Sequence, residues 1–271
     1  MGKQDERENM AVKNNILSIR NVKKNFQIGR QTVEVLKNID LDVKEGEFVS
    51  IIGSSGCGKS TLLKLITALD AATSGEIRID GEKVVKPSPK CSMIFQEARL
   101  FPWLSAGQNI VFTLPAGVSR EEKNRIVKEH ISLVGLEGFE TALPSQLSGG
   151  MQQRVSIARG LATKPRLLLL DEPFGALDAF TRIDLQEELL NIWEREKTTM
   201  LMVTHDIDEA IYLSDRIIVL SAKPGIVKAD IEINLPRPRE RSSYEFLQIR
   251  RNVLKALFEK EGAMREVEYY I

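Results

Sequence analysis

One short segment constrains the fold of this chain more than any other. Residues 53–60 read Gly-Ser-Ser-Gly-Cys-Gly-Lys-Ser and match the pattern G-x-x-x-x-G-K-[ST]. Apolar residues 48–52 precede the segment and a leucine-rich stretch follows it, which is the strand, loop, helix order of a parallel α/β sheet. Glycines let the backbone wrap closely around an anion, and the following helix points its positive end at the same place. The segment therefore predicts a phosphate-binding loop in an α/β fold.

Two side chains of this loop would act on a bound nucleotide. Lys59 would place a full positive charge beside the β and γ phosphate oxygens, and Ser60 would offer a hydroxyl to Mg²⁺. The alternative is a chance Gly/Ser turn, but such a turn would not account for the flanking strand and helix. The predicted nucleotide-binding residues of the loop are Gly53, Ser54, Ser55, Gly56, Cys57, Gly58, Lys59, Ser60 and Thr61.

Two adjacent acids, Asp171 and Glu172, end the run of leucines at 167–170. Because charged side chains are rarely buried, acids at the tip of an apolar strand need a reason. A strand beside the strand of the phosphate loop would bring Asp171 to the Mg²⁺ and leave Glu172 to polarise the attacking water. A solvated strand end is the alternative interpretation for one acid alone.

Charge and composition disfavour several classes of protein. The chain has 38 Lys plus Arg and 38 Asp plus Glu, so no net positive field would gather nucleic acid, and we expect no nucleic-acid partner. Its two cysteines, Cys57 and Cys91, are too few for a disulfide framework. Residues 1–15 are polar and contain no signal-peptide core, and no apolar run reaches the ~20 residues that span a bilayer. We therefore expect membrane association only through partner proteins.

Residues 147–154 decide among the kinases, GTPases, helicases and transport ATPases that a phosphate loop leaves open. Their sequence, Leu-Ser-Gly-Gly-Met-Gln-Gln-Arg, resembles the LSGGQ signature of ABC ATPases and lies before the acidic strand, as in that family. Physically, this segment is a second Ser/Gly-rich turn that leads into a helix, which makes it a second candidate anion site. Taken alone, it would be a plain helix start. The resemblance implies nucleotide contacts by Ser148, Gly149, Gly150 and Gln152.

The remaining landmarks of the family occur in order along the chain. The resemblance implies that Phe26 stacks on adenine, and that Gln96 senses Mg²⁺ and leads into a subdomain touching a membrane subunit. It also implies that Asp178 lies in a D-loop across a dimer interface and that His205 contacts the γ-phosphate. Each residue alone has an ordinary interpretation, as an aromatic of the core or surface, a strand-end amide, a helix cap or a satisfied histidine. Their joint order favours the family.

The resemblance covers nearly the whole chain and implies its organisation. We expect an α/β fold: a P-loop NTPase core of the ABC ATPase type with an N-terminal antiparallel β subdomain and an inserted α-helical subdomain. The expected divisions are a flexible segment at 1–15, the ATPase domain at 16–240 with its insert near 100–160, and a helical extension at 241–271. ATP and Mg²⁺ are the implied cofactors. The implied catalytic residues are Lys59, Gln96, Glu172 and His205, and the implied metal ligands are Ser60, Gln96 and Asp171.

The resemblance also implies partners and a location. ABC cassettes dimerise head to tail, so we expect a homodimer, two transmembrane permease subunits and, indirectly, an extracytoplasmic solute-binding protein, at the cytoplasmic face of the membrane. Segments 94–104, 175–182 and 235–239 are similar to the nitrate/sulfonate/taurine importer group, although Leu143 and residues 107–109 depart from its pattern. The alternative is a soluble ABC ATPase that moves no solute, such as an iron–sulfur cluster assembly ATPase.

Several charged side chains lie outside these motifs. Arg237, Arg239 and Arg241 form either a contact patch or a solvated face, and we expect the solvated face because charge runs usually face water. His130 lies on the charged, amphipathic helix predicted at 120–134, and we expect no catalytic role for it.

Overall fold

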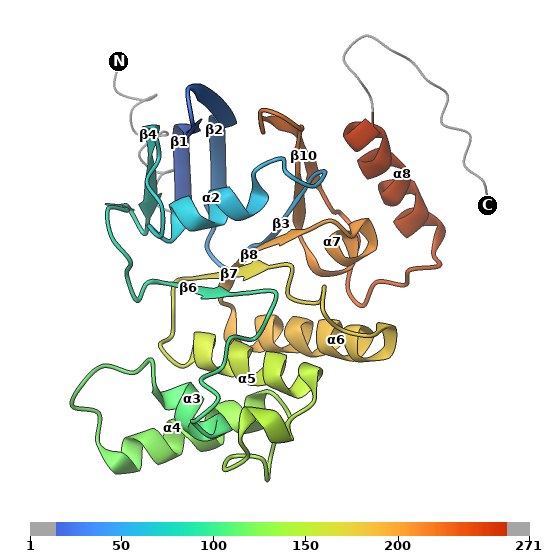
Figure 1. Ribbon diagram of the computed structural model, residues 1–271. Helices are drawn as coiled ribbons and strands as arrows, with labels where there is room; N and C mark the ends of the chain where they lie inside the picture. The colour runs from blue at the N-terminus through green and yellow to red at the C-terminus, as the bar shows by residue number, and fades with distance from the viewer. Residues whose placement is uncertain (1–14, 259–271) are drawn as a thin grey trace, which may run out of the picture.

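The computed structural model describes residues 15–258, which form two β-sheets with helices on both faces of the larger one (Figure 1). The predicted flexible segment at 1–15 lies outside the described residues except for Asn15, which begins the first strand. Within the described part of the chain, no helix combines the length and the apolar character needed to cross a membrane.

The smaller sheet contains the N-terminal strands and is antiparallel. Its strand order is β2 (Gln31–Lys44), β1 (Asn15–Ile28), β4 (Ser74–Ile79) and β5 (Glu82–Lys83). Leu17 and Ile19 of β1 are fully buried, because alternate side chains of a strand point to the same face of the sheet. This sheet is the antiparallel subdomain that the family resemblance implied.

The larger sheet carries the phosphate loop. Its strand order is β10 (Val227–Glu232), β9 (Arg216–Leu220), β3 (Phe48–Ile52), β8 (Thr199–Thr204), β7 (Leu167–Asp171) and β6 (Cys91–Ile94). All neighbouring pairs are parallel except β9 with β10, which is an antiparallel edge. The α/β fold expected from the sequence is therefore confirmed.

The order of these strands corrects one expectation. The acidic strand β7 was expected beside the loop strand β3, but β8 lies between them. All three strands are parallel and in close register, so their carboxyl ends still meet at one edge of the sheet. Asp171 consequently reaches the phosphate loop across the end of β8.

The hydrophobic core is divided between the two faces of the larger sheet. Val49 and Ile51 of β3 pack in a cluster with α2 (Lys59–Ile66), whereas Phe48 and Ile52 pack in a second cluster with helices of the opposite face. This division follows from the alternation of side chains along a strand. The helices of the opposite face are α5 (Gly149–Leu161), α6 (Ala179–Glu196) and α7 (Ile207–Leu213).

A group of helices lies below β6 in the view of Figure 1. α3 (Ala106–Val111) and α4 (Arg120–Leu133) pack against α5, and the short 3₁₀ helix η1 (Pro144–Gln146) leads into α5. The hydroxyls of Ser105 and Ser119 accept backbone N–H groups and cap α3 and α4, which explains where both helices begin. His130 is buried on α4, where Nδ1 contacts the Ile126 carbonyl at 2.9 Å.

The three tail arginines do not form the solvated face expected from the sequence. Arg239 is only 5% exposed, and its guanidinium donates to carbonyls at the end of α7, including that of Ser214 at 2.6 Å. Arg237 pairs with Asp215 at 2.7 Å. Arg241 stacks over the Tyr212 ring at 3.9 Å from its centroid. The expectation failed because the last carbonyls of a helix lack intrahelical partners, and guanidinium groups satisfy them here.

The tail then enters α8 (Tyr244–Phe258), which is the helix expected in the C-terminal extension. Phe246 and Val253 of α8 are buried and belong to the same hydrophobic cluster as α7. Residues 259–271 of the predicted extension lie outside the described residues.

Candidate nucleotide-binding site

The phosphate loop joins the end of β3 to the start of α2, and its glycines permit close approaches. Gly58 has φ of 100°, and a Cβ placed on it would lie 2.6 Å from Leu36 Cδ2. A Cβ on Gly53 would lie 2.6 Å from Cys57 Sγ and 2.9 Å from the Leu220 carbonyl oxygen. At both positions, only glycine allows the backbone to fold this tightly.

A pocket opens over this loop at the carboxyl edge of the larger sheet. Lys59 is 6% exposed, and its ammonium donates to the Gly53 carbonyl at 2.7 Å, which holds the charge inside the loop. The Cys57 side chain is instead buried in the core. The backbone N–H of Cys57 donates to the Ser54 carbonyl at 3.2 Å. The residues that line the pocket are Val35, Ser55, Gly56, Gly58, Lys59, Ser60, Thr61, Glu172 and His205.

Ser60 and Asp171 meet beside this pocket. The Ser60 hydroxyl donates to Asp171 Oδ1 at 3.0 Å, so the two sequence motifs that predicted a metal site are brought together. Burial raises the pKa of Asp171 and the negative charge of Glu172 adds to this effect, whereas the Ser60 hydrogen bond opposes it. A cation nearby would stabilise the ionised form of this carboxylate. A hydroxyl and a carboxylate are both ligands that Mg²⁺ accepts. These two side chains therefore fit the expected Mg²⁺.

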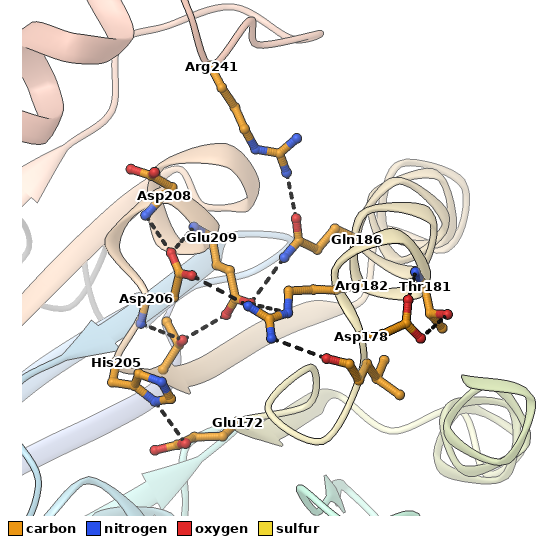
Figure 2. Close-up of polar contacts among 12 residues, drawn as sticks. Glu172, Asp178, Thr181, Arg182, Gln186, His205, Asp206, Asp208, Glu209 and Arg241 are labelled. Atoms are coloured by element: carbon orange, nitrogen blue, oxygen red, sulfur yellow. Dashed lines mark hydrogen bonds and ion pairs between the residues drawn. The ribbon is translucent and has the colours of Figure 1, made fainter. Parts of the chain in front are cut away.

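Glu172 and His205 face each other across the same edge (Figure 2). Glu172 Oε2 lies 3.0 Å from His205 Nδ1. Glu172 has φ of 47°, which is unusual for a residue with a side chain, and its N–H donates to the Val203 carbonyl of β8 at 2.9 Å. Strained backbone of this kind is common at functional sites, where the surrounding structure fixes a side chain in place.

Gln96 and Phe26 lie outside the lining of this pocket. Gln96 is exposed just beyond β6, and a Cβ on Gly175 would approach its Nε2 to 2.9 Å, so the amide packs against the loop that follows Glu172. Phe26 is 37% exposed near the end of β1, with the Lys24 ammonium 4.6 Å from its ring centroid. Val35 of β2, which the sequence did not single out, lines the pocket instead.

The second Ser/Gly turn also lies away from the phosphate loop of its own chain. Ser148 caps α5, its hydroxyl accepting the Met151 N–H at 3.3 Å, and the Gln152 side chain donates to the Pro144 and Leu147 carbonyls. A Cβ on Gly150 would overlap the Thr181 side chain of α6. The turn is therefore built tightly against the start of α6.

Asp178 caps the N-terminus of α6. Its carboxylate accepts the Thr181 N–H at 3.1 Å and the Thr181 hydroxyl at 2.7 Å, and these hydrogen bonds lower the pKa of Asp178. Asp178 thus holds the threonine on which Gly150 packs. The second turn and Asp178 therefore lie side by side, joined through Thr181.

Two further polar side chains of α5 anchor the backbone on either side of Gln96. Gln153 of α5 is 2% exposed and donates to the Phe95 carbonyl at 3.1 Å. Arg159 of the same helix donates to the Ala98 and Arg99 carbonyls at 3.0 Å. Gln153 lies within the signature-like segment at 147–154, although the sequence assigned it no role of its own, whereas Arg159 is an ordinary polar residue on an amphipathic helix and carries no motif.

Comparison with known proteins agrees with this geometry. A family model described as ABC transporter matches residues 36–175. The aliphatic sulfonates import ATP-binding protein SsuB of Bacillus cereus is 55% identical over 251 residues, which cover 92% of this chain and 98% of that protein. The bicarbonate transport ATP-binding protein CmpC of Synechococcus elongatus is 50% identical over 83% of this chain and 35% of its own length.

Solved structures show the same fold. A dimeric ATP-binding cassette in a post-hydrolysis state with ADP and phosphate matches with a TM-score of 0.71 and 37% identity, over 81% of this chain and all of that one (100%). The protein cbiO1 of Clostridium perfringens, part of the ABC transporter complex cbiONQ, matches with a TM-score of 0.71 and 27% identity, over 81% of this chain and 89% of that one. With a phosphate loop, an acidic strand and a signature turn in the expected places, the chain belongs to the ABC transporter family of ATP-binding proteins.

Proposed function

We propose that this chain is the ATP-hydrolysing subunit of an ABC importer. The observation that carries the proposal is the pocket over the phosphate loop, which brings Lys59, Glu172 and His205 together at the carboxyl edge of one sheet. This arrangement supplies a positive charge for the phosphates, a carboxylate for the attacking water and an imidazole within reach of the reacting group.

Each side chain has a defined role in hydrolysis. Lys59 holds the β and γ phosphate oxygens, and the loop N–H groups with the start of α2 surround the remaining charge. Glu172 accepts a proton from the attacking water, while His205, 3.0 Å from that carboxylate, orients it and contacts the γ-phosphate. Ser60 and Asp171 would hold Mg²⁺, which when bound would neutralise phosphate charge, and Gln96 would sense the metal from the adjoining loop.

Two copies of the chain would complete the site. Ser148 and the α5 N-terminus form an anion-seeking turn without a lysine, and this turn does not line the phosphate pocket of its own chain. In a head-to-tail pair, Ser148, Gly149, Gly150 and Gln152 of one subunit would reach the γ-phosphate held by the other, with Asp178 at the interface. ATP then favours the closed pair, and hydrolysis removes the contacts that favour closure.

The names of the relatives support the proposed partners and solute. One relative is named as a sulfonate import ATP-binding protein and another as a bicarbonate transport ATP-binding protein, which supports uptake of a small anion. The chain would bind permease subunits at the cytoplasmic face of the membrane and couple ATP hydrolysis to this uptake. They favour import over the soluble iron–sulfur assembly ATPase. Co-purification with a permease, followed by ligand screening of its solute-binding protein, tests this part of the proposal.

Replacing the proposed catalytic carboxylate tests the hydrolytic role. Glu172→Gln keeps the size of the side chain but cannot accept the proton, so ATP turnover should fall by about 10²–10⁴-fold while ATP binding is retained. Turnover is measured by phosphate release and binding by titration. Glu187→Gln, on the exposed face of α6, is the matched control and should keep the normal rate. Normal turnover by Glu172→Gln would contradict the assignment.

A further inference from the structure

A buried carboxylate lies behind the proposed catalytic histidine. Glu209 of α7 is 7% exposed, and its Oε2 accepts the hydroxyl of Thr204, the residue before His205, at 2.8 Å. The same Thr204 oxygen accepts the N–H of Asp206, the residue after His205, at 3.0 Å. Glu209 therefore fixes the backbone on both sides of His205 through one hydroxyl (Figure 2).

The same carboxylate faces the helix that follows the D-loop. Glu209 Oε1 accepts the Gln186 amide at 3.1 Å and lies 3.9 Å from Arg182 Nε. Arg182 in turn donates through Nη2 to the carbonyl of Leu177 at 3.2 Å, directly before Asp178. A chain of polar contacts thus runs from the His205 loop through Glu209 to the D-loop (Figure 2).

The helix itself does not require this carboxylate. Asp206 already caps α7 by accepting the N–H groups of Asp208 and Glu209 at 2.8 and 3.0 Å. Burial raises the pKa of Glu209, so keeping an acid here is costly unless its contacts have another use. Arg182 Nε is buried without a hydrogen bond among the described residues, and its ion pair with Glu209 Oε1 spans 3.9 Å.

We infer that Glu209 is a positioning residue for ATP hydrolysis, which couples the loop of His205 to the D-loop through Thr204 and Arg182. The inference rests on the proposed role of His205. Glu209 does not line the nucleotide pocket, so it acts only by holding the two loops in register. The network also reaches the C-terminal extension, because Gln186 Oε1 accepts Arg241 Nη2 at 2.5 Å.

The test compares four full-length proteins: wild type, Glu209→Gln, His205→Ala and the double variant. A glutamine at position 209 keeps the volume of the side chain but removes the negative charge that pairs with Arg182. If the oxygen of this glutamine accepts the Thr204 hydroxyl, its NH₂ group must face the donor NH₂ group of Gln186. We expect kcat to fall about tenfold or more, since small misplacements of catalytic groups are costly, while the Kd for ATP changes less than about threefold.

The double variant separates positioning from stability. If Glu209 acts through His205, adding Glu209→Gln to the His205→Ala protein should lower kcat by less than about twofold. The reason is that two residues that act as a unit are already disabled when one of them is replaced. A merely structural role would give the same fractional loss in both backgrounds. Asp208→Asn is the matched control on the same helix as Glu209. It breaks the ion pair between Asp208 of α7 and Arg250 of α8, and should lower the melting temperature without changing kcat.

The outcomes are distinguishable. If His205→Ala is slow but Glu209→Gln hydrolyses ATP at the wild-type rate, or if the losses multiply, the inference is wrong and the proposed function stands. If His205→Ala itself keeps the wild-type rate, the proposed role of His205 fails and the inference fails with it. Should Glu209→Gln not fold, Arg182→Lys replaces it in the same scheme, since lysine keeps the charge but cannot span Leu177 and Glu209 together.

Discussion

Replacing Lys59 by methionine should weaken ATP binding far more than it disturbs the fold. The stem of Lys59 is buried, and methionine keeps most of that apolar volume while removing the ammonium. The ammonium sits inside the phosphate loop, 2.7 Å from the Gly53 carbonyl, so a bound triphosphate would lie directly beside it. The lost interaction is therefore mainly the attraction between one positive charge and the phosphate oxygens.

The size of this effect can be worked out from the geometry. Two unit charges about 4 Å apart interact by about 4 kcal/mol at the effective dielectric of a partly exposed site. The hydrogen bond to Gly53 and salt screening offset part of this, which leaves about 2–4 kcal/mol, or about 30-fold to 1000-fold in Kd.

Calorimetric titration with MgATP measures the change directly. Lys64→Met is the matched control, because Lys64 lies on the same helix but is exposed and does not line the pocket. The Kd of the control for ATP should lie within about twofold of the wild-type value. This difference in binding free energy is well below the roughly 1.4 kcal/mol that each tenfold change in Kd represents. A folded Lys59→Met protein with the same affinity as this control would refute the reasoning.

Two further predictions concern stability. Burial, only partly offset by the ion pair with Arg154, raises the pKa of Glu188 to about 7, so the native state binds more protons than the unfolded chain between about pH 4.5 and pH 7. Stability should therefore fall as pH rises through this window, by up to about 3 kcal/mol, and urea titrations of Glu188→Gln should lack this component; identical pH profiles would contradict the assignment. Arg241→Ala removes the donor to the side-chain oxygen of Gln186, which is only 2% exposed, and should lower the free energy of unfolding in urea by about 1–3 kcal/mol. Arg251→Ala, on the exposed face of α8, is the control and should lower it by less than about 0.5 kcal/mol. Equal losses in the two variants would count against the contact between Arg241 and Gln186.

Local patterns predicted the elements of the core well. The structure gives β3 the bounds expected from the sequence and ends α4 one residue before the end of the helix predicted at 120–134, because both are regular apolar or amphipathic runs between clear breaks. β10 was missed, since its residues alternate with charges in the manner of a half-exposed edge strand. The insertion of β8 between β3 and β7 could not be predicted, because strand order depends on packing between distant segments.

The site shows the same division between local and distant information. The phosphate loop and the tip of β7 carry motifs whose side chains meet as expected, with Ser60 donating to Asp171. Glu209 carries no such signal, because its partners come from β8 and α6 and are brought together only by the tertiary fold. The buried arginines of the tail were misjudged for the same reason: their partners are main-chain carbonyls, which leave no trace in side-chain patterns.

A crystal structure of the Glu172→Gln protein with MgATP tests the central claim most directly. We expect a head-to-tail pair in which Lys59 of one subunit and Ser148 of the other both lie within about 3 Å of oxygens of the same triphosphate. Nucleotide bound to the phosphate loop with Ser148 facing no phosphate in any pairing of the subunits would contradict it.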